Sequence, residues 1–501
     1  MLRHLDHPQR LSCNPLVRTE FAGVTPAAGA VRVRLAVDAA VEKLPERRRA
    51  IVRRCDLQGE AHSAVIRDLG ISERHFYRER RAALEAIASE VCAPRHCSGV
   101  EVRSYDSKSE RLAFQFDFAE AARQAGDGTR AASLLGDART AELDDVDRAQ
   151  LECRLAELLC ESGSMERAFE HLRSACESLH GPSPQTSGAA SLLAWRSGRV
   201  EAAVALADRV IAGQQRTPAR TRTRFETRAF SIALLVKSEI EVAQGRWRSG
   251  RRYALMARDA AVPGGTEFGA LRARAALAAA FACMFEPAQL NDAAVELESG
   301  YRSAIASGLM LEALLAKLHL GVIHRFRDAP KQSAGAIEGL VTIADRMLSP
   351  EQYAVVCLEL ANAYLHCGYP GKALTIVDEV RRRQPRLSDK FPFADLLSAG
   401  AYLSQGEYRR ARDLSASVCG TMSALGIITS VGESLRIQAE ANLALGELRI
   451  AKDLIAAAIT ELERGGHPHT IAKTHASAAR ITGNRKHALA ARELLNALRA
   501  R

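Results

Sequence analysis

The chain has 501 residues, of which 47% are hydrophobic and 26% are charged, and its formal net charge is +10. This length exceeds what one hydrophobic core supports, so we expect several domains or an extended repeat array, and the composition excludes a disordered chain. Aromatic residues make up only 5%, which favours closely packed helices over strands, while the positive charge suits a polyanionic partner without proving one.

The cysteines indicate a reducing compartment. Eleven are scattered along the chain, and Cys160 and Cys357 stand within apolar helical patterns, as reduced thiols that pack as small hydrophobic groups do. The first residues contain no apolar secretory segment, and no uncharged apolar run reaches the roughly 18 residues that a membrane span needs. We therefore expect a cytoplasmic protein without a membrane span.

In chain order, the sequence predicts an all-α protein with four segments. Residues 1–30 contain Pro and Gly without periodicity, which indicates an irregular arm. Residues 31–91 indicate a compact helical domain, and residues 92–109, rich in Ser with Pro and Gly, predict a linker. Helical periodicity then continues almost without interruption over residues 110–501.

The helical domain contains a helix-turn-helix pattern. Pro45 with Glu46 favours a helix start, and Gly59 is expected to close the loop that follows. In Leu69-Gly70-Ile71-Ser72, the Gly favours a tight turn and Ser72 an N-cap for the next helix. Apolar side chains at helical spacing predict the inner faces of the two helices that flank this turn, namely Val65, Ile66 and Leu69 before it and Phe76, Ala83, Leu84 and Ile87 after it.

The outer face of the second helix is polar and basic. A recognition helix reads base edges from its N-terminal half, and flanking Arg side chains neutralise phosphates. Arg74 and Arg78 are one turn apart, so both are expected to reach the major groove, whereas Arg47 and Arg48 begin an earlier helix beside the phosphates. The candidate DNA-binding residues are Ser72, Glu73, Arg74, His75, Tyr77, Arg78, Arg81, Arg47 and Arg48.

This segment resembles the last helix-turn-helix of bacterial sigma factors, region four, and the related domains of response regulators. The shared features are Leu44-Pro45-Glu46-Arg47, Leu57 with Gly59, Leu69-Gly70-Ile71-Ser72 and Ala83-Leu84. The resemblance implies a DNA-binding transcriptional regulator with double-stranded DNA as its partner. Ile66 and Phe76 are larger than the family's residues at these positions, which predicts a wider or differently angled helix pair. Too few residues precede position 31 for a polymerase-binding region, so we expect a regulator and not a sigma factor.

Residues 110–501 show internal repetition. A Gly followed five positions later by a small residue recurs at Gly126/Ala131, Gly163/Ala168, Gly198/Ala203, Gly245/Gly250, Gly368/Ala373, Gly406/Ala411, Gly446/Ala451 and Gly483/Ala488. Seven positions before each Gly stands another small residue: Ala119, Ala156, Ser191, Ser238, Ala361, Ala399, Ala439 and Ala476. The pattern predicts hairpins in which Gly ends one helix with a left-handed backbone and the small residues let two helix axes approach. The longer gap after Gly245 predicts two irregular repeats near residues 286 and 330.

Segments such as Leu360 to Leu374 and Ala399 to Ala411 resemble tetratricopeptide repeats, although most repeats lack the family's helix-opening Trp and terminal Pro. The resemblance covers about three quarters of the chain. It implies an α-solenoid whose concave face binds a protein or peptide partner.

Several sequence features allow a second interpretation. The helix-turn-helix segment could be a hairpin that caps the solenoid, since Leu44 to Glu90 holds ten Arg against eight Asp or Glu. Cys92, His96 and Cys97 fit a linker better than a metal site, and Gly368 to Ala373 lacks the Ser or Thr of a phosphate loop. For the basic run we prefer a solvated face to a second phosphate-binding patch; it comprises Arg216, Arg220, Arg222, Arg224, Arg228, Arg246, Arg248, Arg251 and Arg252.

We therefore predict a DNA-binding regulator whose solenoid binds a protein, peptide or ligand signal. The alternative is a protein-interaction scaffold whose helix-turn-helix-like segment contacts protein, as the bulky Ile66 and Phe76 would favour. No catalytic constellation stands out, so we expect neither an enzyme nor a cofactor or metal.

Overall fold

The computed structural model describes residues 37–57, 60–92, 108–139, 143–215, 217, 221–261, 266–383 and 392–499. All regular structure within these ranges is helical. Internal contacts divide the chain into two units, residues 1–114 with 306–308 and residues 115–305 with 309–501. We describe the two separately, as the N-terminal unit and the solenoid.

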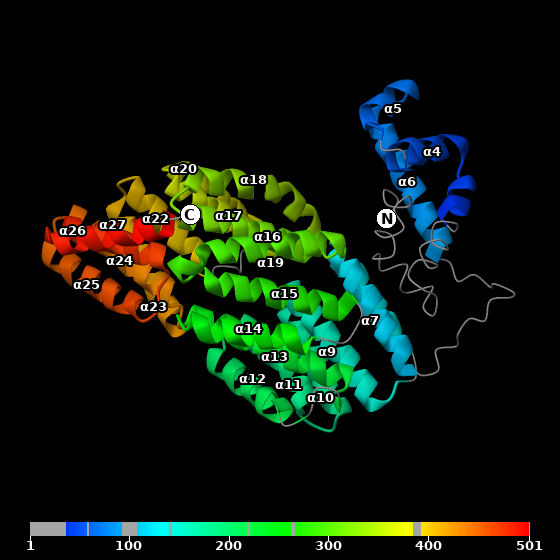
Figure 1. Ribbon diagram of the computed structural model, residues 1–501, viewed down its shortest axis with the longest axis horizontal. Coiled ribbons are helices and arrows are strands. Elements are labelled where there is room, and N and C mark those ends of the chain that lie inside the picture. Colours follow the sequence, from blue (N-terminus) through cyan, green and yellow to red (C-terminus); the bar gives the residue numbers. More distant parts are fainter. Residues whose placement is uncertain are drawn as a thin grey trace. The chain divides into compact units, whose positions relative to one another are not determined.

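The N-terminal unit is built from short helices (Figure 1). Residues 37–42 are helical. They are followed by α4 (Glu46–Ile51), the π-helical turn η2 (Val52–Leu57), α5 (His62–Asp68) and α6 (Glu73–Cys92). Pro45 is the N-cap of α4, where its missing N–H costs nothing. Gly59 lies outside the described residues.

A four-residue turn joins α5 to α6. Gly70 takes a positive φ of 61°, which glycine adopts without steric cost. The backbone N–H of Ile71 donates to the carbonyl of Ile66 at 3.3 Å, and the Ser72 hydroxyl accepts from the His75 N–H at 3.3 Å. Ser72 therefore caps α6 as the sequence predicts, because its side chain satisfies one of the free donors of the first helical turn.

Phe76 forms the centre of this unit. Its side chain is fully buried in a cluster with Ile51, Cys55 and Val65. Ile66, Leu69 and Ile71 pack on the cluster from the α5 side and remain half-buried. Further along α6, Ala83 and Ile87 are buried and Leu84 is half-buried. The two bulky residues are thus accommodated, Phe76 inside the core and Ile66 at its edge.

The solenoid is a succession of helical pairs (Figure 1). The first helices of the pairs are α7 (Lys108–Gln124), α9 (Asp145–Glu161), α11 (Pro184–Arg196), α13 (Arg224–Ala243), α15 (Thr266–Cys283), α17 (Met310–Phe326), α19 (Pro350–His366), α22 (Phe393–Ser404), α24 (Ile428–Ala444) and α26 (Pro468–Thr482). Their partners are α8 (Gly128–Ala138), α10 (Met165–Ser178), α12 (Val200–Gln215), α14 (Trp247–Ala260), α16 (Leu290–Ala306), α18 (Pro330–Met347), α20 (Pro370–Arg383), α23 (Tyr408–Ala424), α25 (Leu448–Glu463) and α27 (Arg485–Arg499).

First and second helices differ in burial. In α9 nearly every residue from Ala149 to Cys160 is buried, whereas its partner α10 buries only Ala168 and Ala175. From α9 on, each first helix also packs on the first helix of the next pair. The first helices therefore form an inner layer that is covered by neighbours, and the second helices form an outer layer with one apolar stripe and one solvent face.

The glycine pattern is confirmed in backbone geometry. All eight predicted glycines have φ between 70° and 85° and stand between the helices of a pair. The close approach is clearest at Gly250, where an added Cβ would lie 3.0 Å from the carbonyl oxygen of Ser238 on the facing helix. This contact explains why Gly replaces Ala at that position.

The last repeat departs from the predicted pattern. The small residues of the first seven repeats are buried, but Ala476 and Ala488 are exposed. The reason lies in the turn: Gly483 is itself the C-cap of α26, whereas Gly446 follows a C-cap at Leu445. The buried positions move accordingly, to Ala478 and Ala491.

The two irregular repeats are helical hairpins. Between α15 and α16 the turn contains the 3₁₀ helix η4 (Pro287–Gln289) instead of a left-handed glycine. Between α17 and α18, Asp328 takes the left-handed conformation with φ of 58°. Short polar side chains tolerate this conformation better than most, so the repeat survives without its glycine.

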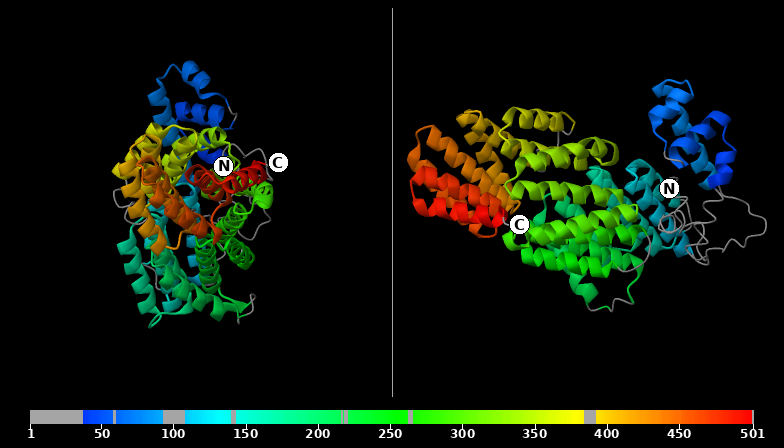
Figure 2. Two further views of the ribbon diagram at one scale, coloured as in Figure 1. Left: turned by 90° about the vertical axis from the view of Figure 1, so that its left-hand side faces the viewer. Right: turned by 45° about the horizontal axis from the view of Figure 1, so that its top comes forward.

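The solenoid closes on itself along a line of turns that we call the seam. Four hairpin glycines lie against turns much later in the sequence: Gly126 against Met347, Gly163 against Glu351, Gly198 against Leu425 and Gly245 against Gly465. At its far end α27 contacts η4, and Leu498 joins a core cluster with Leu290 and Ile323. Both views in Figure 2 accordingly place the C-terminal end beside mid-chain helices.

Candidate functional site

The predicted DNA-binding residues occupy one surface of the N-terminal unit. Ser72, Glu73, Arg74, Tyr77, Arg78, Arg81 and Arg47 are exposed, whereas His75 and Arg48 are half-buried. Tyr77 has 45% of its surface exposed, and its hydroxyl lies 3.4 Å from His62 Nδ1. The first half of α6 thus presents polar side chains opposite the buried Phe76.

Most of the described arginines of this unit pair with carboxylates within it. Arg48 donates to Glu79 at 2.8 Å, which lowers the pKa of that carboxyl. Arg80 donates through Nε to the buried Asp56 at 3.0 Å. Four further arginines have carboxylate partners: Arg49 and Arg53 pair with Glu42, Arg54 with Glu60 and Asp68, and Arg81 with Glu85.

The other described arginines are Arg47, Arg67, Arg74 and Arg78, and none of them forms an ion pair with a described residue. Nη2 of Arg78 lies 2.8 Å from Nδ1 of His75, and its charge helps to lower the pKa of Glu79. Arg67 is exposed on α5, and our sequence reasoning did not select it. The near-balance of charge in this segment therefore hides a set of cations without ion pairs to described residues, because Asp56, Glu60, Asp68, Glu79 and Glu85 pair with other arginines.

The second candidate site is a cavity of about 1060 Å³ inside the solenoid. Its walls come from the first helices of successive pairs, α13 through α26. Apolar side chains such as Phe281, Leu365, Leu396 and Ile437 line much of it. The volume lies at the upper end of the range of roughly 300–1,000 Å³ that holds small molecules.

Three histidines gather in the wall of this cavity. His467, the N-cap of α26, donates from Nε2 to the carbonyl of Met284 at 3.0 Å and accepts from the His469 N–H at 3.1 Å. Its ring also stacks on Phe326 with centroids 3.6 Å apart. Burial keeps the pKa of His467 and His366 well below the ordinary value and lowers that of His469 to about 3. All three rings are therefore neutral near pH 7.

A ladder of charges crosses the same wall between α24 and α26. Arg436 donates to Glu433 and Glu440, each at 2.6 Å. Lys473 donates to Glu433 at 3.1 Å and lies 3.4 Å from His366 Nε2. Arg480 lies 2.9 Å from Glu440. Because burial and nearby guanidinium groups disfavour its charged form, the pKa of Lys473 is lowered.

Sequence reasoning missed the cavity because it treated the repeats as scaffold. A signal was available in the periodicity of α24: Arg436 and Glu440 follow Glu433 by three and seven positions, on a helix that carries no other charged residue. Such spacing places three charges on one helix face. In an inner helix that face can only point to a partner helix or to a cavity.

The basic run does not form a solvated face throughout. Arg228 is buried, where its Nε donates to Glu157 at 3.0 Å, and Arg222 donates to the carbonyl of Gln214 at 2.6 Å. Arg246, Arg248 and Arg252 are exposed, as expected. Arg216 and Arg220 lie outside the described residues.

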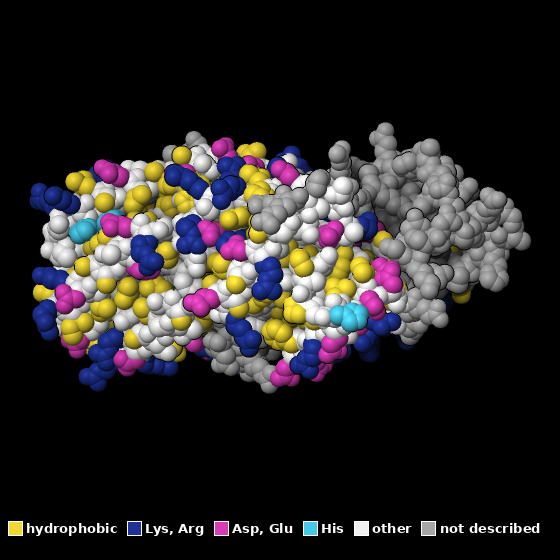
Figure 3. Space-filling view, turned by 90° about the horizontal axis from the view of Figure 1, so that it is seen from below, with side chains coloured by type: hydrophobic (Ala, Val, Ile, Leu, Met, Phe, Trp, Pro, Cys, Tyr) yellow, Lys and Arg dark blue, Asp and Glu magenta, His cyan; other side chains and the backbone are white. Residues whose placement is uncertain are grey.

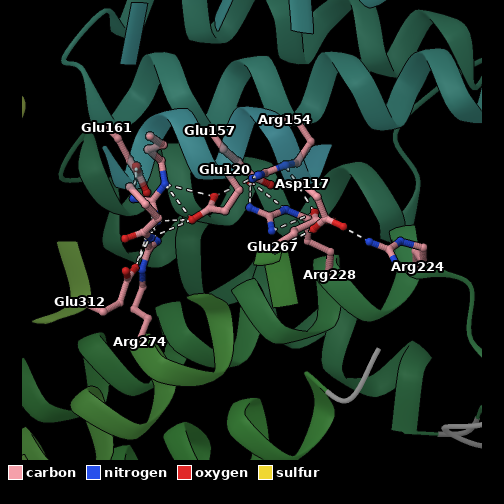
Figure 4. A network of polar contacts seen from close by, with 12 residues as sticks. Asp117, Glu120, Arg154, Glu157, Glu161, Arg224, Arg228, Glu267, Arg274 and Glu312 are labelled. Carbon is pink, nitrogen blue, oxygen red and sulfur yellow. Dashed lines mark hydrogen bonds and ion pairs between the residues drawn. The ribbon is translucent and has the colours of Figure 1, made fainter. Parts of the chain in front are cut away.

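Arg228 belongs to a buried ionic network in the N-terminal half of the solenoid (Figure 4). Glu267 contacts Arg228 at 3.1 Å and Arg154 at 3.5 Å. Across the solenoid, Arg123 on α7 reaches Glu312 on α17 at 3.2 Å. The charges of Arg123 and Arg154 outweigh the effect of burial and lower the pKa of Glu120 to about 2. The network joins α7, α9, α13, α15 and α17, so it fixes the curvature of the inner layer.

Charges on one face of the solenoid are mixed. On the face shown in Figure 3, basic and acidic side chains are interspersed among apolar ones over the described residues. A surface that binds nucleic acid typically carries an extended basic patch. The described part of this face has no such patch.

Other kinds of site find no support in the described residues. Within them, no group of three or more His, Cys, Asp or Glu side chains could hold a metal ion. Cys92, His96 and Cys97 lie outside the side chains that can be described. No described helix combines the length and the apolar character that a transmembrane segment requires.

No known protein family matches the chain, and no curated protein matches it either. Among solved structures, a Rap protein complexed with Competence and Sporulation Factor is similar at 14% identity, covering 78% of this chain and 99% of that one, with a TM-score of 0.46. A kinesin light chain from Podosopora anserina with nearly identical tetratricopeptide-like repeats is 19% identical, covers 37% of this chain and 93% of that one, and has a TM-score of 0.27. A signal transduction ATPase from Pyrococcus horikoshii with a tetratricopeptide repeat sensor is 10% identical, covers 97% of this chain and 71% of that one, and has a TM-score of 0.28. TM-scores this low transfer no function to this chain.

Proposed function

We propose that this protein is a DNA-binding transcriptional regulator of the cytoplasm. In this proposal the first half of α6 enters the major groove of double-stranded DNA, and the solenoid binds the protein, peptide or ligand signal that biases DNA binding. One observation carries the proposal: Arg74 and Arg78 are exposed one turn apart on a helix whose opposite face is anchored by Phe76, and neither forms an ion pair with a described carboxylate.

The physical case combines geometry with charge. A helix fits the major groove with its N-terminal residues on the base edges, and Arg side chains there can donate to guanine. Arg47, on α4, would contact phosphates, and Arg67 extends the same role to α5. Arg48 is already paired with Glu79, so we assign it a positioning role between α4 and α6. The resemblance to sigma-factor region four supports the same docking mode.

The test is selection of bound fragments from random duplex DNA by the purified full chain. We expect an enriched motif and an affinity that falls steeply with salt, because phosphate contacts release counterions. Arg78→Ala should weaken binding to the preferred site by about 1–3 kcal/mol. Arg410→Ala, an exposed arginine of the solenoid, removes the same charge and should leave the affinity unchanged.

A protein-binding surface is the second candidate for this face. Glu73 stands beside Arg74 at the start of α6, and Tyr77 is exposed, a residue type enriched at protein interfaces. This alternative predicts retention on DNA without an enriched motif, lost at moderate salt. An Arg78→Ala variant that binds the selected DNA as well as the unmodified chain would reject the major-groove contact.

A further inference from the structure

The cavity wall holds a group of nitrogen-bearing side chains, most of which keep hydrogen-bonding capacity that no described residue uses. His366 is the exception, because its Nδ1 donates to the carbonyl of Asn362 at 2.9 Å and its Nε2 accepts from Lys473. Arg325 comes from α17, His366 from α19, and His469 and Lys473 from α26. We call these four residues the donor cluster. The rings of His366 and His469 lie 5.4 Å apart between centroids, and Lys473 Nζ lies 3.4 Å from His366 Nε2. Three helices that are distant in sequence thus bring their donors to one place.

Two members of the donor cluster are buried with unused hydrogen-bonding capacity. His469 is 3% exposed, yet its ring nitrogens have no hydrogen-bond partner among the described residues. Arg325 is 8% exposed; it donates through Nη2 to Glu359 at 2.9 Å, but its Nε is buried without a partner. Arg325 and His469 both line the cavity, so both residues fit a site that is completed by a bound acceptor.

The ladder holds one cation more than it holds carboxylates. Arg436, Lys473 and Arg480 share the two carboxylates of Glu433 and Glu440. The three other carboxylates that line the cavity pair with cations outside the ladder, since Glu359 pairs with Arg325, Asp328 with Arg499 and Glu239 with Arg196. A ligand that brings one negative charge to Lys473 would balance the ladder.

Much of the rest of the cavity is apolar. Phe281 and Phe326 stand on the α15 and α17 side, and Leu365, Leu396 and Ile437 on the side of α19, α22 and α24. A molecule that fills this space must bury apolar surface, which stabilises binding by roughly 25 cal/mol per Å². The cavity therefore combines one anion-binding corner with a large apolar compartment.

We infer that the solenoid cavity binds a monocarboxylate with an apolar body, seated with its carboxylate on Lys473, Arg325 and the His469 ring. Lys473 keeps a third N–H for this carboxylate, because Glu433 and His366 engage the other two. A neutral His469 donates one ring N–H, and Arg325 supplies a terminal guanidinium N–H that Glu359 does not engage. The body of the ligand lies against the leucine and phenylalanine side chains.

In the proposed function, this ligand would be the signal that the solenoid binds. Only its role as a signal rests on the proposed function; the binding itself does not. The carboxylate could belong to a small organic acid or to the C-terminus of an apolar peptide. Both carry the same recognised group, so the experiment separates them by the body of the probe and not by its charge.

The test is calorimetric titration of the full chain, without DNA, with decanoate, decylamine and decanol. We expect decanoate to bind at least about tenfold more tightly than either of the others, which share its body but lack its charge. A second pair of probes is a leucine-alanine pentapeptide with a free C-terminal carboxylate and the same peptide as its amide. Binding of decanoate alone identifies a small acid, and binding of the free peptide alone identifies a peptide terminus.

Variants locate the site. Lys473→Met should weaken the binding of the carboxylate probe about tenfold or more, Lys473→Arg should largely restore it, and Lys452→Met, an exposed lysine on α25, should not change it. Leu396→Trp should block the cavity for every probe. Three results would each overturn the inference. Decanoate and decylamine could bind equally tightly, no carboxylate probe could bind, or Lys473→Met could bind the carboxylate probe as tightly as the unmodified chain. If no DNA motif is enriched but decanoate binds, only the DNA-binding role is rejected. If a DNA motif is enriched but no carboxylate probe binds, only the proposed ligand is rejected.

Discussion

Gly245 and Gly465 pack backbone against backbone although each belongs to a different helical turn of the solenoid. A Cβ added to Gly245 would lie 2.7 Å from the Cα of Gly465, closer than atoms approach without displacement. The two turns thus touch at the one residue type that permits it. This contact belongs to the seam along which the early repeats rest on the late ones.

Gly245→Ala should destabilise the solenoid by more than the backbone strain of an alanine at positive φ, which is about 1–2 kcal/mol. The matched control is Gly368→Ala: Gly368 has a φ of 79°, but an added Cβ there meets nothing within 4 Å. Denaturant midpoints of the two variants separate the contact from the strain. Equal midpoints would show that the seam contributes nothing measurable.

Glu267→Gln should lower the free energy of unfolding by about 3–5 kcal/mol, because it leaves the buried charges of Arg228 and Arg154 with one carboxylate fewer. The Glu267 side chain is fully buried among three arginines. Glu407→Gln breaks an exposed pair with Arg410 and should cost less than about 1 kcal/mol. Urea unfolding of both variants checks the contrast, and a mild effect at Glu267 would mean that water reaches the network.

The free energy of unfolding should fall as pH drops below about 6.5. Burial beside Lys473 and Arg325 lowers the pKa of His469 to about 3. Between these two values the unfolded chain binds a proton that the folded chain excludes, so stability is lost as pH falls. The window from pH 6.5 to about 4.5 lies above the ordinary pKa of carboxylates.

In that window His469→Asn should flatten the pH dependence by at most roughly 1.4 kcal/mol per pH unit, the value for one proton. His180→Asn replaces an exposed histidine and should leave the slope as it is. Chemical denaturation repeated at several pH values provides both slopes. An unchanged slope in His469→Asn would indicate that this ring already accepts a proton in the folded protein.

Phe76→Ala should unfold the N-terminal unit selectively, since loss of a buried phenylalanine costs about 3–5 kcal/mol and the core of this unit is small. Its neighbour Tyr77 is exposed, and Tyr77→Ala should cost less than about 1 kcal/mol. Limited proteolysis that maps cleavage to residues 37–92 provides the readout. Protection of this region in Phe76→Ala would contradict a core built around that ring.

The sequence predicts the local features of the structure better than the features that depend on distant residues. The turn glycines, the Ser72 cap and the buried face of α6 follow from residues close together in the chain, and the structure has them in place. Two local expectations needed correction: Ala476 and Ala488 are exposed because the last turn shifts its cap, and Arg228 is buried. The α15/α16 and α17/α18 hairpins were predicted only from the length of the gap.

The cavity and the ionic network lay beyond sequence reasoning for a physical reason. His467 meets Met284, and Arg123 meets Glu312, because the solenoid curves until distant inner helices face one another. That curvature is the sum of many small angles between successive helical pairs, which no single motif encodes. Charges such as Glu120 and Lys473 therefore resemble solvent-facing residues until the curvature is known.

The seam has a consequence for how the array can change in length. In an open solenoid each repeat contacts only its neighbours, so one repeat can be added or removed at modest cost. Here Gly163 and Gly245 must arrive opposite Glu351 and Gly465. Deletion of a single helical pair between them would misalign all of these contacts together, so the number of repeats is coupled to the closure of the fold.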